Sequence, residues 1–361
     1  ADRRVIRRGG PNVAEQGEAL DDSPQRPGPS RGSAITEPLP APVGSGAGRV
    51  VTGLLGTATA GLGGLAVCRL VGLDWFTPLA QLISFTPYLV PGGLLVALMC
   101  AVARRWRIAV AAGLVVLVLT AVTAPRAIGD DSPGPADGIP LRVMTVNVYH
   151  GGSAGPLMAL VRAERPDVLS LQEVTAEALA ELEAAGMAGL LPYSAARPQP
   201  GVAGTALYGH APLTGLRTLD SRTRFDMARA RTVHKGVTLD LVAVHPSPPI
   251  PAGGATAAWH RELGWLPAPD LGDEAVTVLA GDFNATLDHS GFRKLIGDGY
   301  VDAADAVGTG LTPTWQAGWV PPVVIDHVLV ERGVGVRAVR VHPVPGSDHR
   351  AVVADLTLPE G

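Results

Sequence analysis

Polar side chains suited to phosphate chemistry interrupt or end several apolar stretches of the sequence. The stretch TVLAGDFNATL, residues 277–287, begins as an apolar strand and then sets Asp282 and Asn284 on either side of Phe283. The same pattern recurs at Asn147, Glu173, His245, Asp326, Asp348 and His349. A buried carboxylate is costly unless it is paired or binds a metal, so any one of these residues could simply serve in a turn or a cap.

The combined set is better explained by chemistry. Hydrolysis of a phosphoester needs hard oxygen ligands for Mg²⁺, a base for water, and donors for the charge that develops on phosphorus. Carboxylates, carboxamides and imidazoles at the ends of several strands supply all three. The residue types therefore predict a phosphoryl hydrolysis site.

Short apolar strands alternate with helical stretches from Leu141 onward, which predicts an α/β (α+β) domain with two sheets over residues 140–358. The expected strands are 141–148, 167–174, 204–209, 237–245, 275–283, 324–330, 334–344 and 351–358. The expected helices are 156–164, 176–186, 256–266 and 290–297.

The first third of the chain has a different composition. Residues 1–48 are rich in Pro, Gly, Ser and Arg without apolar periodicity, which predicts a disordered tail. Three uncharged apolar runs follow, at about 50–68, 79–103 and 108–124, and they predict three membrane spans within residues 49–125. A buried helical core is the alternative, but three such runs with short loops are hard to enclose in a soluble shell. Residues 126–139 are expected to be a linker.

Arginines flank the apolar runs and predict their orientation. Arg49 precedes the first run, and Arg104, Arg105 and Arg107 separate the second from the third. Basic flanks favour the cytoplasm, so we expect a multi-pass protein of the cell membrane with a cytoplasmic N-terminus and an extracytoplasmic catalytic domain. The two cysteines lie within the apolar runs and leave the compartment undecided.

Residues 140–358 resemble the endonuclease/exonuclease/phosphatase superfamily, which has the DNase I-like fold. The matching segments, in the family's order, are MTVNV, LSLQEV, VAVHPSPP, AGDFNAT, LTPTW, VIDHVLV and GSDHRAV. GDFN and SDHRAV are each moderately specific, whereas the ordered set is strongly specific. The resemblance implies a four-layer αββα sandwich of two mixed sheets, here preceded by three transmembrane helices.

The resemblance also implies a role for each matching residue. Glu173 would be the principal metal ligand, with Asn147 and Asp348 completing or supporting a site for Mg²⁺, or alternatively Mn²⁺. Asp282 would orient or deprotonate the attacking water. Asn284 would donate a hydrogen bond to a phosphate oxygen.

Two histidines complete the implied site. His349 would contact the phosphate, with its tautomer fixed by Asp326. His245 would be a second histidine on the phosphate side or at the leaving group. Some nucleases of the family pair this histidine with an acidic residue on an intervening strand, but the spacing does not assign that role to Asp226, the nearby carboxylate.

Other residues are interpreted as structural. Trp315 is expected to pack in the core, and Arg229 and Arg231 to lie on a solvated strand face. Structural or surface positions are also expected for His150, His210, His260, His289, His327 and His342.

The substrate is less defined than the chemistry, because this fold serves several substrate classes. Residues 140–361 carry 17 Lys and Arg against 23 Asp and Glu, which argues against a tight duplex binder. We favour a Mg²⁺-dependent, nuclease-like phosphodiester hydrolase, with a phospholipid (sphingomyelinase-like) phosphodiesterase or a sugar or inositol phosphatase as alternatives. An inactive membrane-anchored binding module is a lesser one. The expected partners are a nucleic-acid, lipid or envelope phosphodiester and the lipid bilayer, with no protein partner.

Overall fold

The computed structural model describes residues 45–129, 138–150, 152, 154–219, 222–269 and 275–360. Most of the tail predicted for residues 1–48 lies outside these ranges, but residues 45–48 already belong to the first helix. Within the predicted linker, residues 130–137 also lie outside the described part.

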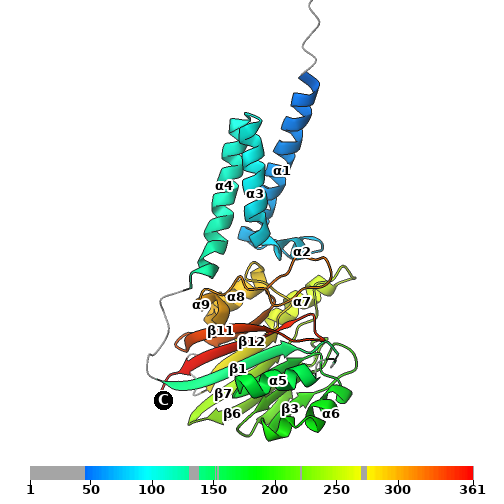
Figure 1. The fold of residues 1–361 in the computed structure, drawn as a ribbon, viewed down its shortest axis with the longest axis vertical. Coiled ribbons are helices and arrows are strands. Elements are labelled where there is room, and N and C mark those ends of the chain that lie inside the picture. Colours follow the sequence, from blue (N-terminus) through cyan, green and yellow to red (C-terminus); the bar gives the residue numbers. More distant parts are fainter. Residues whose placement is uncertain are drawn as a thin grey trace, which may run out of the picture. The chain divides into compact units, whose positions relative to one another are not determined.

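Three apolar helices, α1 (Ser45–Val71), α3 (Thr86–Val102) and α4 (Trp106–Thr123), lie side by side (Figure 1). Two segments, Gly46–Val71 and Trp106–Ala127, are long and apolar enough to cross a membrane. Only 17% and 22% of their most apolar windows are buried, so most of these side chains face outward.

The predicted span over 79–103 is not one helix. It is divided into α2 (Leu79–Ile83) and α3, because a proline ring at Pro87 would clash with the carbonyl of Ile83 in a continuous helix. The 17 residues of α3 extend about 25 Å, less than the hydrocarbon core of a bilayer. Three membrane spans are therefore not confirmed.

The rest of the described chain forms two six-stranded mixed sheets (Figure 1). The first sheet has the order β11-β12-β1-β2-β4-β3, and the second has the order β5-β6-β7-β8-β10-β9. The β1/β2 and β7/β8 pairs are parallel and the other pairs are antiparallel. The strands are β1 Ile139–Asn147, β2 Val168–Gln172, β3 Tyr193–Arg197, β4 Thr205–Gly209, β5 Thr214–Thr218, β6 Ala228–His234, β7 Val237–Val244, β8 Ala275–Asp282, β9 Tyr300–Asp302, β10 Asp326–Glu331, β11 Gly335–Pro343 and β12 Arg350–Leu358.

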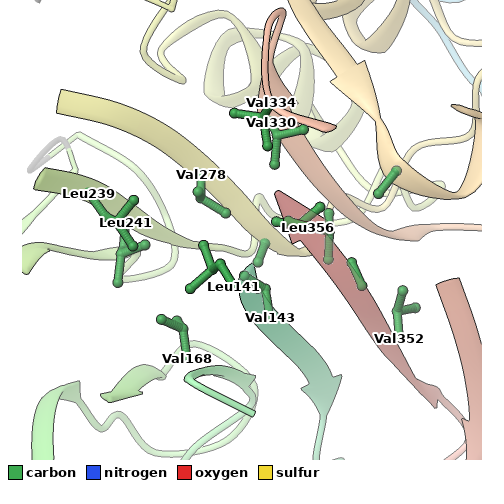
Figure 2. Close-up of a cluster of buried hydrophobic side chains, with 14 of the residues drawn as sticks. Leu141, Val143, Val168, Leu239, Leu241, Val278, Val330, Val334, Val352 and Leu356 are labelled. Atoms are coloured by element: carbon green, nitrogen blue, oxygen red, sulfur yellow. The ribbon is translucent and has the colours of Figure 1, made fainter. Parts of the chain in front are cut away.

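Three apolar clusters define the layers. The central cluster joins the facing sides of the two sheets, as Figure 2 shows for Leu141 and Val143 of β1 beside Leu241 and Val278. A second cluster packs α5 (Ala154–Glu164) and α6 (Ala176–Ala184) on the first sheet, and a third packs α7 (Ala255–Gly264) and α8 (Ser290–Asp298) on the second. The short helices are η1 Ala124–Ala127, η2 Met187–Gly189 and α9 Ala303–Ala306. Helices thus cover the outer faces of a two-sheet sandwich.

All eight predicted strands and all four predicted helices of this domain are present. The sequence did not indicate β3, β5, β6 or β9. Strand β5 is almost wholly exposed, and β9 has three residues, so neither carries an apolar alternation long enough to detect.

Candidate active site

Ends of strands from both sheets meet at a cleft of about 670 Å³. Six predicted site residues line it, and they are Glu173, His245, Asp282, Asn284, Asp348 and His349. The other two lie directly behind them, since Asn147 donates to Glu173 and Asp326 binds His349. The structure therefore brings all eight predicted residues together.

Asn147 joins the two sheets at the base of the cleft. Its Nδ2 donates to Glu173 Oε1 at 3.1 Å and to Asp282 Oδ2 at 3.2 Å, and its Oδ1 accepts the Tyr149 amide at 3.0 Å. The carboxamide thus holds two carboxylates near each other. The Oδ1 atom of Asn147 accepts one hydrogen bond and keeps a second lone pair, so the geometry is compatible with either a supporting or a ligand role.

The Glu173 and Asp348 carboxylates each have one oxygen that faces a histidine nitrogen beyond hydrogen-bond distance, with Glu173 Oε2 3.7 Å from His150 Nε2 and Asp348 Oδ1 3.9 Å from His349 Nε2. Among the described residues, Glu173 Oε2 and Asp348 Oδ1 are buried without a hydrogen-bond partner. Glu173 also has a left-handed φ of +61°, a strained conformation for a residue with a side chain. Burial raises the pKa of Glu173, against the opposing effects of the Asn147 hydrogen bond and His150. Two unsatisfied hard oxygens in an acidic pocket fit a divalent cation.

His349 is held between two other carboxylates. Its Nδ1 lies 3.0 and 3.1 Å from the Asp326 oxygens, and its Nε2 lies 3.6 Å from Asp282 Oδ2. Burial alone would lower the pKa of His349, but Asp326 and Asp282 outweigh that effect and raise this pKa to about 10. The imidazole is therefore a cation at neutral pH.

Asp282, Asp326 and His349 form a compact group whose potential ligand atoms all lie within 4.8 Å of one another. The protonated imidazole offsets the charge of one of the two carboxylates, and a metal bound to this group would displace its proton. Glu173 and Asp348 add further hard oxygens in the same cleft. Burial raises the pKa of Asp282, against the opposing effect of His349, which makes its carboxylate a stronger base than usual.

Asn284 fixes its neighbour Asp282 and contributes to the cleft wall. Its backbone amide donates to Asp282 Oδ1 at 2.8 Å, and its Nδ2 donates to Pro246 O at 3.0 Å. A carboxamide nitrogen carries two hydrogens, so one remains for a ligand.

His245 has a different electrostatic environment. Burial lowers its pKa to about 4, and its Nε2 lies 3.8 Å from Asp282 Oδ2. Its buried Nδ1 has no hydrogen-bond partner in the described part of the chain. Asp226 binds Gln199 and Thr218 instead, at 2.7 and 3.3 Å, so it is not the acidic partner of this histidine.

Trp315 lies in the site, although the sequence was interpreted in favour of core packing. Its Nε1 donates to Asp348 Oδ2 at 3.0 Å, and its ring lines the cleft. The interpretation of Arg229 also needs correction, because its side chain is only 20% exposed and binds the buried carboxylate of Asp240, whereas Arg231 is 49% exposed on the solvated strand face, as expected. The Thr-Trp motif was the available signal for Trp315.

A family model described as Endonuclease/Exonuclease/phosphatase family matches residues 144–349. The chain belongs to this family. Its fold is typical of hydrolytic phosphoesterases, and the apolar helices precede the matched region. No curated protein matches the chain in sequence.

Three solved structures are similar to this chain. D. rerio TDP2 complexed with single strand DNA product is 14% identical with a TM-score of 0.50, over 60% of this chain and 99% of that one. An endonuclease/exonuclease/phosphatase from Beutenbergia cavernae DSM 12333 is 22% identical with a TM-score of 0.46, over 61% and 72%. Sphingomyelinase C from Streptomyces griseocarneus is 17% identical with a TM-score of 0.44, over 60% and 99%. At these identities the likeness concerns the fold alone.

Proposed function

We propose that this family member is a Mg²⁺-dependent phosphodiester hydrolase. The observation that carries the proposal is the pair of unsatisfied oxygens on Glu173 and Asp348, next to a basic Asp282 carboxylate and a cationic His349. Together these groups supply the metal ligands, the base and the cationic donor that phosphoester hydrolysis requires. Mn²⁺ has similar ligand preferences and could replace Mg²⁺.

Each group then has a defined task. Asp282 takes a proton from water as the water oxygen bonds to phosphorus and the bond from phosphorus to the leaving oxygen breaks. His349 and the second amide hydrogen of Asn284 donate to the phosphoryl oxygens, whose charge grows in the transition state. The bound cation, held by Glu173 and Asp348, would neutralise part of that charge. His245 is neutral, so the departing oxygen takes its proton from solvent.

Turnover of bis-p-nitrophenyl phosphate by the full chain in detergent tests this proposal. We expect release of p-nitrophenolate that EDTA abolishes and added Mg²⁺ restores. Glu173→Gln should lower kcat at least a thousandfold, because it removes a charged metal ligand. Glu164→Gln is the matched control, since Glu164 pairs with Arg340 and is not among the residues that line the cleft. Equal turnover by wild type and Glu173→Gln would refute the metal role.

We further propose that α1, α3 and α4 all cross the membrane. Arg69, near the end of α1, and Arg126, just after α4, both bind Asp288, at 2.9 Å and at 2.7 and 2.8 Å. At the opposite end, Arg105 donates to Gly48 O at 3.1 Å. The C-terminal ends of α1 and α4 both lie at Asp288, so the chain must pass in the opposite direction between them, and α3 is the helix that does so. If α1 and α4 span the bilayer, α3 therefore crosses it as well.

The arginines favour a cytoplasmic position for the end of the helices that carries Arg105, with the catalytic domain outside. Labelling with a membrane-impermeant maleimide tests this orientation after both native cysteines are replaced by serine. Tyr193→Cys, in the catalytic domain, should react on intact cells, whereas Arg104→Cys should react only after the cells are opened. The opposite pattern would reverse the orientation.

A further inference from the structure

The α2–α3 connection forms a wall of the candidate active site. Gln81, Ser84 and Phe85 line the same cleft as Asp282 and His349, although the family match begins only at residue 144. An apolar helical segment outside the matched region therefore completes the cleft.

Hydrogen bonds tie this wall to two loops of the catalytic domain. Gln81 Nε2 donates to Pro249 O, and Tyr88 Oη donates to Pro322 O at 2.7 Å. Residues of both loops line the cleft, namely Pro248, Pro249, Ile250, Trp319, Val320 and Pro321. The helical segment thus fixes the shape of the cleft mouth.

Deeper contacts attach the same segment to the second sheet's helices. The buried Asp74, which precedes α2, accepts from Ser290 N at 2.6 Å and from Ser290 Oγ at 2.5 Å. The ring of His289 bonds Ala80 O at 2.8 Å. Together with the ion pairs of Asp288, these contacts attach the wall firmly to the catalytic domain, so it is an integral part of the site.

Apart from the catalytic groups, the lining of the cleft is mainly apolar. Trp319 is 92% exposed and Ile250 is 51% exposed, and Phe85 of the helical segment lines the same cleft. None of the described lining residues is Lys or Arg. A nucleic acid binds chiefly by neutralisation of many phosphates, and this cleft offers no such groups. A ligand with one phosphate and a long hydrocarbon chain matches both parts of the lining.

We propose that the substrate is an amphiphilic phosphoester supplied from the lipid phase. Its phosphate lies at Asp282 and His349, and its apolar chain lies along the wall that includes Phe85 and Trp319. The inference rests on the proposed hydrolase function, and it names the substrate class of that same site. Burial of a hydrocarbon chain against these side chains favours long-chain esters over short ones.

The test compares two p-nitrophenyl phosphodiesters, one with a hexadecyl group and one with a methyl group. The full chain in one detergent at fixed concentration hydrolyses each with Mg²⁺ present, and the readout is the hexadecyl-to-methyl ratio of kcat/KM. Phe85→Ala and Trp319→Ala should each lower this ratio about tenfold. Trp106→Ala is the matched control and should leave the ratio unchanged, because Trp106 is also exposed, at 63%, but begins α4 at the far end of the helices. The hexadecyl ester partitions into detergent micelles to the same extent with every variant, so this effect cancels when the ratios of the variants are compared.

Two outcomes overturn the inference and leave the hydrolase function intact. One is an unchanged ratio in both Phe85→Ala and Trp319→Ala. The other is a larger kcat/KM of the wild type for a single-stranded DNA oligonucleotide than for the hexadecyl ester. Absence of metal-dependent hydrolysis of both esters would instead overturn the proposed function and the inference with it.

Discussion

Strand β10 carries one member of each of two buried His–Asp pairs, and the pairs lie on its two faces. Asp326 binds His349 at the cleft, and the next residue, His327, binds Asp302 at 2.6 Å. Successive side chains of a strand point to opposite faces, so neighbouring residues take part in different regions of the molecule.

The two pairs differ in how completely they are satisfied. His327 Nε2 bonds Ala285 O at 2.9 Å, and its ring packs on Phe283 and Phe292 at centroid distances of 5.6 and 4.3 Å. In contrast, His349 lines the cleft, and its Nε2 faces a carboxylate beyond hydrogen-bond distance. A saturated pair supports the fold, whereas a pair that keeps a donor free can act on a ligand.

Substitution of the two histidines should give the largest contrast. His349→Gln removes the cationic donor at the phosphate, so kcat for bis-p-nitrophenyl phosphate should fall about a thousandfold, and the unfolding temperature should also fall because two buried carboxylates lose their cation. His327→Gln should lower the unfolding temperature but change kcat less than threefold. Steady-state kinetics and thermal unfolding in detergent check both variants. Similar losses of kcat in the two would remove the distinction.

Asp326→Asn should have the next largest effect. We expect kcat to fall about a hundredfold, because His349 loses the carboxylate that orients its ring and favours its protonated form. The sign of the pH dependence follows from the pKa of about 10 for His349. The imidazolium is present below that pH and lost above it. Loss of one carboxylate lowers this pKa, so the alkaline limb of the kcat profile should move to lower pH. An unmoved limb would separate activity from His349.

Asp302→Asn should reduce the free energy of unfolding by about 2 kcal/mol at pH 6, as expected for loss of a buried charged hydrogen bond. Burial lowers the pKa of His327, but Asp302 outweighs it and the net shift is upward. The stabilisation is therefore complete below about pH 6.5, the usual histidine value, and is lost as pH rises through the raised pKa. Urea unfolding at pH 6 and pH 9 should show the smaller loss at pH 9. Equal losses would contradict this role.

Trp315→Phe should have the smallest effect. It removes the hydrogen bond to Asp348 Oδ2 but keeps an aromatic ring in the cleft. Groups that orient a metal ligand typically contribute a factor of ten or more to affinity, so half-maximal activity should need about tenfold more Mg²⁺. A titration of activity with Mg²⁺ measures the concentration that gives half-maximal activity. If Trp315→Phe does not change this concentration, Trp315 has only a packing role.

Sequence reasoning predicted the domain well where the signal is local or ordered along the chain. The alternation of apolar residues indicated the main strands, and the ordered motifs indicated that Glu173, Asp282 and His349 belong to one site. The sequence could not separate the two pairs on β10. Both histidines follow an aspartate, yet each binds a different aspartate, 23 and 25 residues away, that only the sheets bring near.

The contribution of the apolar helices to the cleft was also beyond the sequence. Arg69 and Arg126 bind Asp288, which is 219 and 162 residues away in the sequence. Phe85, at the break in a run interpreted as one span, lines the cleft. Hydropathy describes the length of such runs but not what they contact. Phe85 carries no motif that could have indicated its position.

If Glu173 and Asp348 hold a divalent cation, the full chain should bind Mn²⁺ at these two carboxylates. Electron paramagnetic resonance measures that binding. We predict a bound Mn²⁺ signal in the wild type and in Glu164→Gln, displaced by excess Mg²⁺ and lost in the Glu173→Gln, Asp348→Asn double variant. Equal Mn²⁺ affinity in the wild type and the double variant would contradict the account.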